Sequence, residues 1–358
     1  MRLALGLGER GWQASIAGPE SASIYAPLEP TGISITRLPF RAGNHHPLAD
    51  ARVLRGLIGL MRRERFDLVY ARSDKAGVLG RLASLAAGIP AVVNPGGFAF
   101  DPAVRRGPGR LFSLGLEHLL SPHTQAYVCV SAYERSVAVR HRVGRPDVLE
   151  VVHNAAADYD ATVEADPALE RLSNEGPLAA CITVLRREKG VDLFLDAAPY
   201  VFERLPEARL AVVGNGKLRA TLEHQARTLG LDARLRFFDY RAPSSRWLRS
   251  VDVFVMPSRN EAFGIALAEA MACGVPQITT GVGGTTEVVR DGETGLLCRP
   301  NDPAHLADRI VRLLGDSELR DRMSAASRER HHRCFSLDRM LDETAVVFDR
   351  ASAAGARR

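Results

Sequence analysis

Short apolar runs alternate with helix-like segments along the whole chain. Runs such as "VDVFVMP" (Val251–Pro257) have the length of strands and are apolar on both faces, as strands of a covered parallel sheet are. Segments such as "DARVLRGLIGLMRRER" (50–65) lie between them and have the length and composition of helices. This alternation predicts an α/β protein whose parallel sheets are covered by helices on both faces.

The predicted strands form two groups, one in each half of the chain. In the first half they lie at 14–17, 34–38, 67–70, 91–94, 126–130 and 148–152. In the second half they are the runs "LAACITV", "ARLAVVG", "RLRFF", "VDVFVMP" and "PQITT". The segment between the groups is small, polar and acidic, and at 358 residues the chain is long enough for two domains.

We therefore predict two Rossmann-like domains that face a central cleft. The first spans 1–158, a linker spans 159–176, and the second spans 177–330. A C-terminal helix at 331–358 is expected to pack back on the first domain.

The start of the chain departs from this pattern. A Rossmann-like domain opens on a strand and a glycine-rich turn, whereas residues 2–10 have the pattern of an amphipathic helix, closed by Gly11 before the strand "QASIAG". The sequence predicts that the first domain lacks its first strand. We expect in-frame DNA upstream of Met1 to encode that strand and turn, roughly 15 to 25 residues, and the chain from Met1 to be poorly stable or weakly active.

Composition narrows the cellular setting. The chain is 25% charged and 46% hydrophobic, which are values of globular proteins. It has no run near the ~18 apolar residues of a membrane span, and "MRLALGLGERGW" lacks the features of a signal peptide, so we predict a cytoplasmic location. The five cysteines are widely spaced and without a C-x-x-C pair, which predicts reduced thiols and neither a disulfide framework nor a zinc site.

The net charge of +5 is concentrated in the first half. Residues 1–158 hold 19 Lys and Arg against 13 Asp and Glu, or +6, and the remainder hold 28 against 29, or −1. Arginines gather at 62–65 and 105–110, where they could meet an anionic inner-membrane surface or a phosphorylated acceptor. For either cluster alone, solvated helix faces are the favoured interpretation. Nucleic acid is disfavoured, because no aromatic stacking platform is interleaved with these arginines.

Two glutamates stand out in "PSRNEAFGIALAEAMACGVPQITT" (257–280). The pattern is that of a strand, a turn and a helix at 265–272, with Glu261 in the turn and Glu269 just over one turn into the helix. Ligands bind at this edge of open α/β sheets, and the free N–H groups near 263–265 are donors for an anion or a hydroxyl. The site therefore suits a polyhydroxylated, phosphate-bearing ligand. An alternative explains this stretch equally well, in which Glu261 is an ordinary solvated loop residue and Glu269 an ordinary exposed helix residue.

Three further loops with cations or glycines are predicted at the same edge. Their candidate residues are Arg186, Arg187, Lys189, Gly214, Gly216, Gly283 and Gly284. The cations could clamp a diphosphate, and the glycines would allow a ligand close to the backbone. The "GNG" step lacks a third glycine and is only weak evidence for a dinucleotide. Each loop alone fits an ordinary turn, but four such loops together favour a binding site.

In these motifs the chain resembles the retaining GT-B glycosyltransferases of family 4. The matching runs are "LRREKGVD", "VVGNGKL", "MPSRNEAFGIALAEAMACGVP" and "GVGGTTEVVRDGETGLL", around the family's signature of two glutamates separated by seven residues. The first half agrees through "ERGWQASIAGP", "SDKAGVLGRLASLAAGIP" and "CVSAYERSVA". The likeness is greatest to enzymes that build surface polysaccharide on a lipid carrier.

The resemblance implies a role for each matching position. Lys189 would contact the donor diphosphate with Arg186 and Arg187 beside it, and Glu269 would bond the ribose. The donor sugar would be held by Glu261 and by the N–H groups of Phe263, Gly264 and Ile265. Gly214 and Gly216 would lie near the nucleotide, and Arg241 would contact the base. On the acceptor side, the expected residues are Gly96, Gly97 and Phe98.

The implied activity is transfer of a sugar, with retention, from a UDP- or GDP-sugar to a glycan or polyprenyl-linked acceptor. The glutamates then serve as hydroxyl acceptors, unlike the acid and nucleophile pair of glycosidases. No cofactor or metal is expected, because protein cations neutralise the diphosphate. The Asp158-Tyr159-Asp160 triplet resembles the metal-binding motif of another glycosyltransferase fold, but it falls in the predicted linker and is interpreted as chance.

Three positions depart from the family pattern. Val184 replaces an arginine, Gly96 replaces a histidine, and Ala262 replaces a glycine. These changes leave open a catalytically degenerate protein that binds nucleotide sugars or a partner. A nucleotide-sugar epimerase of similar fold is disfavoured, because the glutamate signature matches the transferases.

Overall fold

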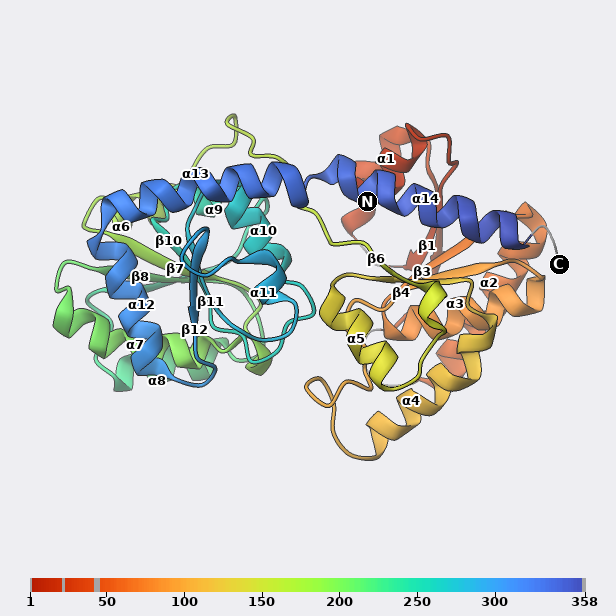
Figure 1. Ribbon diagram of the computed structural model, residues 1–358, viewed down its shortest axis with the longest axis horizontal. Coiled ribbons are helices and arrows are strands. Elements are labelled where there is room, and N and C mark those ends of the chain that lie inside the picture. Colours follow the sequence, from red (N-terminus) through yellow and green to blue (C-terminus); the bar gives the residue numbers. More distant parts are fainter. Residues whose placement is uncertain (1, 21–22, 42–45, 356–358) are drawn as a thin grey trace. The chain divides into compact units, whose positions relative to one another are not determined.

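The computed structural model describes residues 2–20, 23–41 and 46–355. The chain divides into two compact units, one formed by the residues up to His153 with those from Asp338 onward, and the other by Asn154–Leu337 (Figure 1). Residues 159–176, predicted as a linker, lie in the second unit and include α6 (Pro167–Ser173), whose Leu169 and Leu172 are buried. The predicted domain bounds and central cleft stay predictions.

The second unit is built on a sheet of six parallel strands. In spatial order they are β12 (Gly295–Cys298), β11 (Gln277–Thr280), β10 (Val253–Met256), β7 (Leu178–Ile182), β8 (Arg209–Val213) and β9 (Leu235–Phe238). Every residue of β7, β10 and β11 is buried, which explains the continuous apolar composition of β7 and β10, whereas β11 also buries the polar side chains of Gln277, Thr279 and Thr280. Strand order reverses between β7 and β10, and this switch point is where open α/β sheets bind ligands.

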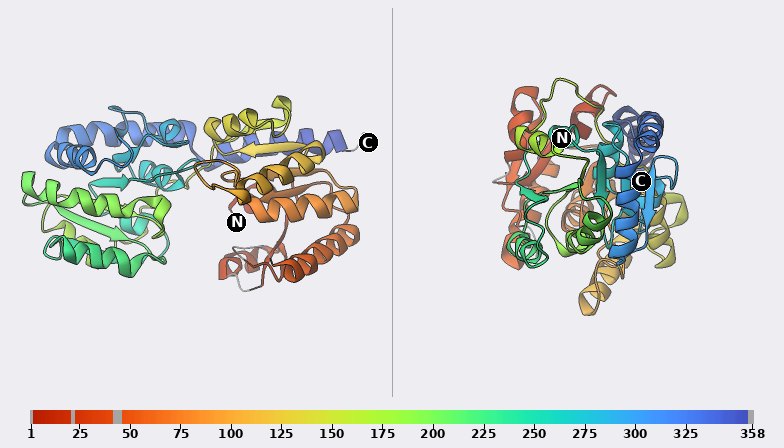
Figure 2. Two further views of the ribbon diagram at one scale, coloured as in Figure 1. Left: turned by 90° about the horizontal axis from the view of Figure 1, so that it is seen from below. Right: turned by 90° about the vertical axis from the view of Figure 1, so that its left-hand side faces the viewer.

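Helices cover both faces of this sheet (Figures 1 and 2). Besides α6 they are α7 (Val191–Arg204), α8 (Arg219–Thr228), α9 (Ser245–Leu248), α10 (Ile265–Ala272), α11 (Thr285–Val288), α12 (Pro303–Gly315) and α13 (Ser317–Cys334), with the 3-10 turn η4 (Arg187–Lys189). The apolar sides of α7, α8 and α12 form one continuous core with β7, β8 and β10.

The first unit contains two separate parallel sheets. One pairs β1 (Ser15–Pro19) with β2 (Ser34–Leu38), and the other has the order β3 (Val69–Arg72), β4 (Ala91–Asn94), β5 (Ala126–Cys129) and β6 (Leu149–Val151). Its helices are α1 (Arg2–Gly8), α2 (Pro47–Glu64), α3 (Asp74–Ala87), α4 (Pro108–Leu120), α5 (Ala132–Arg140) and α14 (Leu337–Gly355), with 3-10 turns η1 (Ser23–Thr31), η2 (Ser121–His123) and η3 (Pro146–Val148).

The strands of the first unit are divided between two sheets, which agrees with the predicted absence of a first strand that would join them. Among the described residues, β1 pairs with β2 alone and β3 with β4 alone. Both sheets nevertheless share the same helices, because Ala17 of β1 and Val69 of β3 pack against one cluster from α2 and α3. Trp12, which precedes β1, and Tyr70 of β3 also contact the same residue of α14, Phe348, with ring centroids 5.5 and 5.1 Å from its own.

Several local predictions are confirmed. The strands predicted at 34–38 and 91–94 have those bounds, and the helix predicted at 2–10 is present as the shorter α1. All five cysteines are free, and Cys129, Cys181 and Cys298 are buried. Within the described ranges, no helix combines the length and apolar character that crossing a bilayer requires.

Candidate functional site

The loops that follow β7 and β10 pack directly on each other at the switch point. The Arg259 N–H donates to the Glu188 carbonyl at 2.8 Å, so the two loops share a backbone hydrogen bond. Gly190 lies in the left-handed region with φ of 66°, and a Cβ there would stand 2.0 Å from the Pro257 carbonyl oxygen. Only glycine permits this approach, which fixes how far apart the loop residues of the two strands can lie.

This packing brings Lys189 and Glu261 together. The Lys189 Nζ donates to the Glu261 Oε2 at 2.5 Å, and the side chains are 25% and 15% exposed. An ammonium and a carboxylate thus lie side by side at the carboxyl edge of the sheet, partly open to solvent. The ammonium can neutralise a phosphate oxygen, and the carboxylate can accept a hydrogen bond from a hydroxyl.

Arg259, which sequence reasoning missed, holds the two loops in place. Its guanidinium donates to both carboxylate oxygens of Asp192 at 2.7 Å, and also to the Arg187 carbonyl and the Asn301 Oδ1 at 3.0 Å. The hydrogen bond to Asp192 is the main reason that the pKa of Arg259 is raised. A bidentate pair of this kind adds geometric specificity, so Arg259 positions the loop that carries Lys189.

The other predicted cations of this loop are more open. The side chains of Arg186 and Arg187 are exposed, and the Arg186 guanidinium lies 3.9 Å from the Glu188 carboxylate. Val184, which stands where the family has an arginine, is 50% exposed. The diphosphate contacts predicted for Arg186 and Arg187 stay predictions.

The second glutamate lies on α10, whose start is shaped by Gly264. This residue has φ of 97° and directly precedes Ile265, so the first N–H groups of α10 belong to the segment predicted to hold a donor sugar. The Phe263 ring is buried and stacks edge-on against Phe335, with centroids 5.6 Å apart, so its side chain is core and only its backbone is a candidate contact.

Glu269 and Tyr240 share one environment. The pKa of Tyr240 is raised, first by burial and then by the negative charge of Glu269. Tyr240 follows β9 and is 38% exposed. It therefore presents an aromatic ring near Glu269, the carboxylate predicted to bind the ribose. Its neighbour Arg241 has an exposed side chain, while the Arg241 carbonyl accepts from the Trp247 Nε1 at 2.7 Å. The contact predicted between Arg241 and the base stays a prediction, and Tyr240 is an additional candidate that the sequence interpretation did not name.

The predicted glycines serve contacts between loops. A Cβ on Gly214 would stand 1.9 Å from the Thr183 carbonyl oxygen, and one on Gly216 would stand 2.5 Å from that of Leu185. A Cβ on Gly283 would lie 1.9 Å from the Glu261 carbonyl oxygen, which also accepts from the Gly284 N–H at 3.0 Å. The structure explains these glycines by backbone packing around the site, and their proximity to a nucleotide stays a prediction.

In the first unit, the loop after β4 contains the predicted acceptor residues. Gly96 and Gly97 both have positive φ, 63° and 107°, and Phe98 is buried against Phe100 and Tyr127. The Phe98 side chain therefore anchors the loop, and the glycine backbone is its candidate contact surface. The side-chain Oδ1 of Asn94, at the end of β4, is buried and has no hydrogen-bond partner in the ranges that the structure describes.

The buried carboxylate of Glu134 holds this loop in place through hydrogen bonds to the backbone. The Glu134 Oε1 accepts from the Gly97 N–H at 2.5 Å and its Oε2 from the Val130 N–H at 2.6 Å, while the Ser131 Oγ caps α5 by accepting from the Glu134 N–H. Burial raises the pKa of Glu134 to about 7, against the opposing effect of the two N–H donors. Glu134 therefore links the loops after β4 and β5, a role absent from the sequence interpretation.

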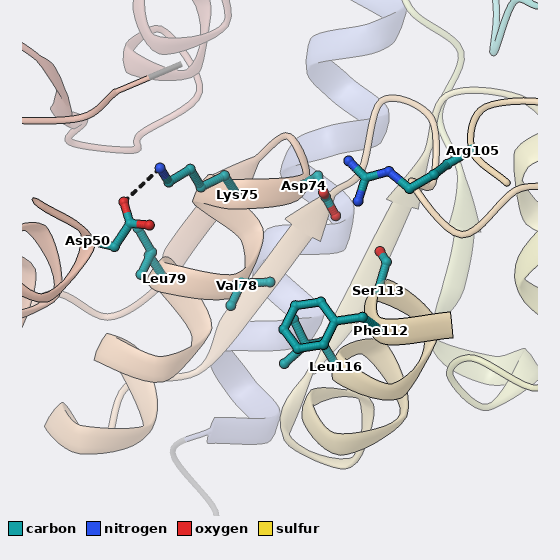
Figure 3. A pocket seen from close by; sticks show the side chains of 9 residues that line it. All are labelled: Asp50, Asp74, Lys75, Val78, Leu79, Arg105, Phe112, Ser113 and Leu116. Atoms are coloured by element: carbon teal, nitrogen blue, oxygen red, sulfur yellow. Dashed lines mark ion pairs between the residues drawn. The ribbon is translucent and has the colours of Figure 1, made fainter. Parts of the chain in front are cut away.

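A small pocket lies between α2, α3 and α4 of the same unit (Figure 3). Its polar side holds the ion pair of Lys75 with Asp50, at 2.6 Å, and its apolar side includes Val78 and Phe112. It is enclosed by ordinary helix packing, and we assign no ligand to it.

The close approach at Gly190 gives a stability prediction with a matched control. Gly230 has nearly the same φ, 68°, but a Cβ there would meet nothing within 4 Å. We expect Gly230→Ala to cost about 1 kcal/mol from the left-handed conformation alone. Gly190→Ala should cost at least about 3 kcal/mol, because the Pro257 carbonyl must also move. Denaturant unfolding of both variants measures the difference, and equal costs would contradict the described packing.

Comparison with known proteins agrees with this arrangement. Residues 163–330 match the family described as glycosyl transferases group 1, and residues 1–155 match the glycosyl transferase 4-like domain. Together the two matches span most of the chain and both units. The chain belongs to the GT-B glycosyltransferases of group 1, and it is a glycosyltransferase.

Individual relatives agree with the family. The chain is 28% identical over 76% of its length, and 72% of the relative's, to the Escherichia coli UDP-Gal:alpha-D-GlcNAc-diphosphoundecaprenol alpha-1,3-galactosyltransferase. It is 34% identical over 60% of its length to the D-inositol 3-phosphate glycosyltransferase of Corynebacterium efficiens, and the match spans about half, 54%, of that protein. The crystal structure of Anabaena HepE with UDP-glucose covers 100% of this chain and 96% of its own, with a TM-score of 0.80 at 19% identity, and shows the shared fold.

Proposed function

We propose that this protein transfers a sugar, with retention, from a nucleotide-sugar donor to a glycan or lipid-linked acceptor in surface polysaccharide or glycolipid assembly. The observation that carries the proposal is the pair of Lys189 and Glu261 at the switch point, 2.5 Å apart and beside the first N–H groups of α10. A cation, a carboxylate and backbone donors in one place match a diphosphate attached to a sugar.

Each group then has one task. The Lys189 ammonium stabilises the negative charge that develops on the diphosphate as the bond between its oxygen and the anomeric carbon of the donor sugar breaks. Glu261 and the N–H groups at 263–265 hold the hydroxyls of the donor sugar, and Glu269 accepts from the ribose. The acceptor hydroxyl attacks from the face that the diphosphate leaves, and a diphosphate oxygen takes its proton. Positioning and electrostatic stabilisation account for the rate enhancement, and no metal ion takes part.

The acceptor class is supported by the relatives and by the first unit. One relative is named for a sugar acceptor on diphosphoundecaprenol, and another for D-inositol 3-phosphate, both of which carry phosphate. The first unit holds the positive charge of the chain and presents the Gly96–Gly97 backbone at the carboxyl edge of its sheet. We propose a phosphorylated, lipid-linked acceptor bound there, with the protein located in the cytoplasm and at the inner-membrane surface.

A thermal-shift screen across nucleoside diphosphates tests the donor site. A ligand that binds only the folded protein raises its stability with concentration above Kd. UDP or GDP should raise the melting temperature in a saturable manner, whereas the matching monophosphate should act more weakly because it lacks the group that Lys189 contacts. No shift with any nucleoside diphosphate would contradict the proposal.

Glu269→Ala is expected to weaken binding of the active nucleoside diphosphate by about 1 to 3 kcal/mol, because a charged acceptor for ribose hydroxyls is removed. Isothermal titration calorimetry measures the change. Glu203→Ala is the control, since Glu203 is exposed in the last turn of α7, at the opposite edge of the sheet. Unchanged affinity in Glu269→Ala would remove Glu269 from the site.

A further inference from the structure

One arginine of the second unit joins the loops that follow β8 and β9. Arg219 is the first residue of α8, and its Nη1 donates to the Gly214 carbonyl, in the loop after β8, at 3.1 Å. The same nitrogen donates to the Phe238 carbonyl and to the Asp239 Oδ1, both at 3.2 Å. Because Phe238 ends β9 and Asp239 follows it, one guanidinium connects the carboxyl ends of two neighbouring strands.

The guanidinium of Arg219 is held in the orientation that this connection needs. Its Nε donates to the Glu223 carboxylate one turn later in α8, and its central carbon lies over the Phe237 ring, 5.2 Å from the centroid. The side chain is 27% exposed. A guanidinium presents its donors in a rigid planar fork, so fixing one side of the group directs the other side at the two loops.

Helix stability does not explain an arginine at this position. A positive charge in the first turn of a helix opposes the helix dipole. The side chain of Asp239 is 76% exposed, and an ion pair that is this open contributes little to folding. The distinctive contacts of Arg219 are therefore its hydrogen bonds to the Gly214 and Phe238 carbonyls, which fix the two loops relative to each other.

Asn215 extends this connection to the loop after β7. With its amide nitrogen oriented toward two acceptors, Asn215 donates to the Gly214 carbonyl at 3.0 Å and to the Asp239 Oδ1 at 2.9 Å. Its backbone carbonyl accepts from the Leu185 N–H at 3.0 Å. The loops after three adjacent strands, β7, β8 and β9, are therefore joined by one network of hydrogen bonds.

The segment after β9 carries the predicted nucleoside contacts. Asp239 directly precedes Tyr240, whose ring shares an environment with Glu269, and Arg241, the predicted contact of the base. Among the described residues, β9 pairs with β8 alone, so it is the edge strand of the sheet on this side. The position of the segment therefore depends on side-chain contacts, which are the network described above and the hydrogen bond from the Trp247 Nε1 to the Arg241 carbonyl.

We propose that Arg219 is a positioning residue for the nucleoside part of the donor. It holds residues 239–241 in the arrangement that receives the base and the ribose, and it acts through them. The diphosphate is served by Lys189, whose hydrogen bond to Glu261 does not involve this network. The proposal rests on the proposed function for the identity of the ligand, and it assigns Arg219 to nucleoside binding and not to the chemical step.

Arg234 supplies a matched control at the other end of β9. Its guanidinium carbon lies 4.0 Å from the Phe202 ring centroid, and its Nη1 donates to the Phe202 and Pro206 carbonyls at 3.4 and 3.2 Å. Arg234 directly precedes β9 and so lies at the amino edge of the sheet, away from the predicted site. Alanine at 219 or 234 therefore removes a ring contact and two bonds to backbone carbonyls, but only the first change lies beside the nucleoside segment.

Isothermal titration calorimetry of the full chain with UDP and with GDP tests the assignment. We expect Arg219→Ala to raise the Kd of the nucleotide that the wild type binds about tenfold, and Arg234→Ala to change it less than about twofold. In sugar transfer, the donor KM of Arg219→Ala should rise with kcat nearly unchanged, because nucleoside contacts are the same in the ground state and the transition state. Unfolding in denaturant shows whether each variant is folded.

Asn215→Ala gives a second measurement in case Arg219→Ala does not fold. The Asn215 side chain is exposed, and its removal takes one donor from Asp239 while Arg219 stays in place, so Kd should rise about threefold. Unchanged affinity in folded Arg219→Ala, or in Asn215→Ala where the first variant is unfolded, would overturn the proposal. So would an equal loss of affinity in Arg219→Ala and Arg234→Ala, or a fall in kcat with donor KM unchanged. A wild type that binds neither UDP nor GDP would overturn the proposed function and this role of Arg219 with it, whereas equal binding by the wild type and Arg219→Ala removes only the role of Arg219.

Discussion

Lys189→Ala is expected to lower the rate of sugar transfer by roughly 10²-fold or more while changing folding stability by less than about 1 kcal/mol. The ammonium lies at a partly open edge, 2.5 Å from Glu261, so it contributes little to the fold. In the reaction it faces the charge that develops on the leaving diphosphate, where preorganised cations have their largest effect. Initial rates with donor and acceptor, and unfolding in denaturant, measure the two quantities.

The first unit supplies a matched control for this variant. Lys75 forms a comparable ion pair with Asp50, at 2.6 Å and with side chains 18% and 15% exposed. Lys75→Ala removes the same type of pair at a similar burial and should leave the chemical step unchanged. If Lys189→Ala loses stability and keeps its rate, the diphosphate contact lies elsewhere.

Glu134→Gln is expected to remove a pH dependence centred near 7 and to lower kcat/KM at alkaline pH about tenfold. The ionised Glu134 accepts from the Gly97 and Val130 N–H groups, and its pKa is raised to about 7 by burial. Protonation places an O–H, and glutamine an N–H, against one of these donors, so one charge-assisted hydrogen bond is lost, about 1.5 to 3 kcal/mol. Wild-type activity should therefore rise through pH 7, and the variant should stay low.

The stability of the wild type should change with pH in the opposite direction to its activity. This difference separates a role of Glu134 in positioning the Gly97 loop from a general loss of folding in the variant. A carboxyl whose folded pKa is raised from 4.5 to about 7 favours the folded state below pH 4.5, and this contribution is lost as pH rises through 7. Glu134→Gln should remove that decline, so the unfolding free energy of the variant should fall less between pH 5 and pH 8 than that of the wild type, while the variant stays less active at pH 8. A variant that is less stable and less active at every pH would assign Glu134 to the core alone.

The sequence predicted those features that local patterns encode. Strands β2 and β4 were placed with their bounds, β2 as the alternating run Ser-Ile-Thr-Arg-Leu and β4 as a short apolar run, and the amphipathic pattern at 2–10 predicted α1. Lys189 and Glu261 were placed at one sheet edge because each follows a buried strand, and the carboxyl ends of parallel strands share an edge. The fold class followed from these rules and from the family resemblance.

The missed residues act through contacts between distant segments. Arg259 is 67 positions from Asp192, and Glu134 is 37 positions from Gly97, so neither partner is visible in a local window. The glycines at 190, 214 and 283 face backbone oxygens of other loops, which requires coordinates to see. Residues 159–176 lacked a strand pattern and were predicted as a linker, although Asp166 caps α6 by accepting from the Ala168 N–H at 3.0 Å. This capping signal was present in the sequence.

Proton NMR of the reaction product tests the central claim most directly. The purified chain is incubated, in buffer containing EDTA, with a panel of α-linked UDP- and GDP-sugars and a polyprenyl-diphosphate-linked sugar acceptor. The anomeric coupling of the newly attached sugar then reports the stereochemistry. We predict consumption of one donor and a new α-glycosidic bond formed without added metal. A β-linked product, or no donor consumed by a chain that binds the nucleoside diphosphate, would contradict the proposed retaining transfer.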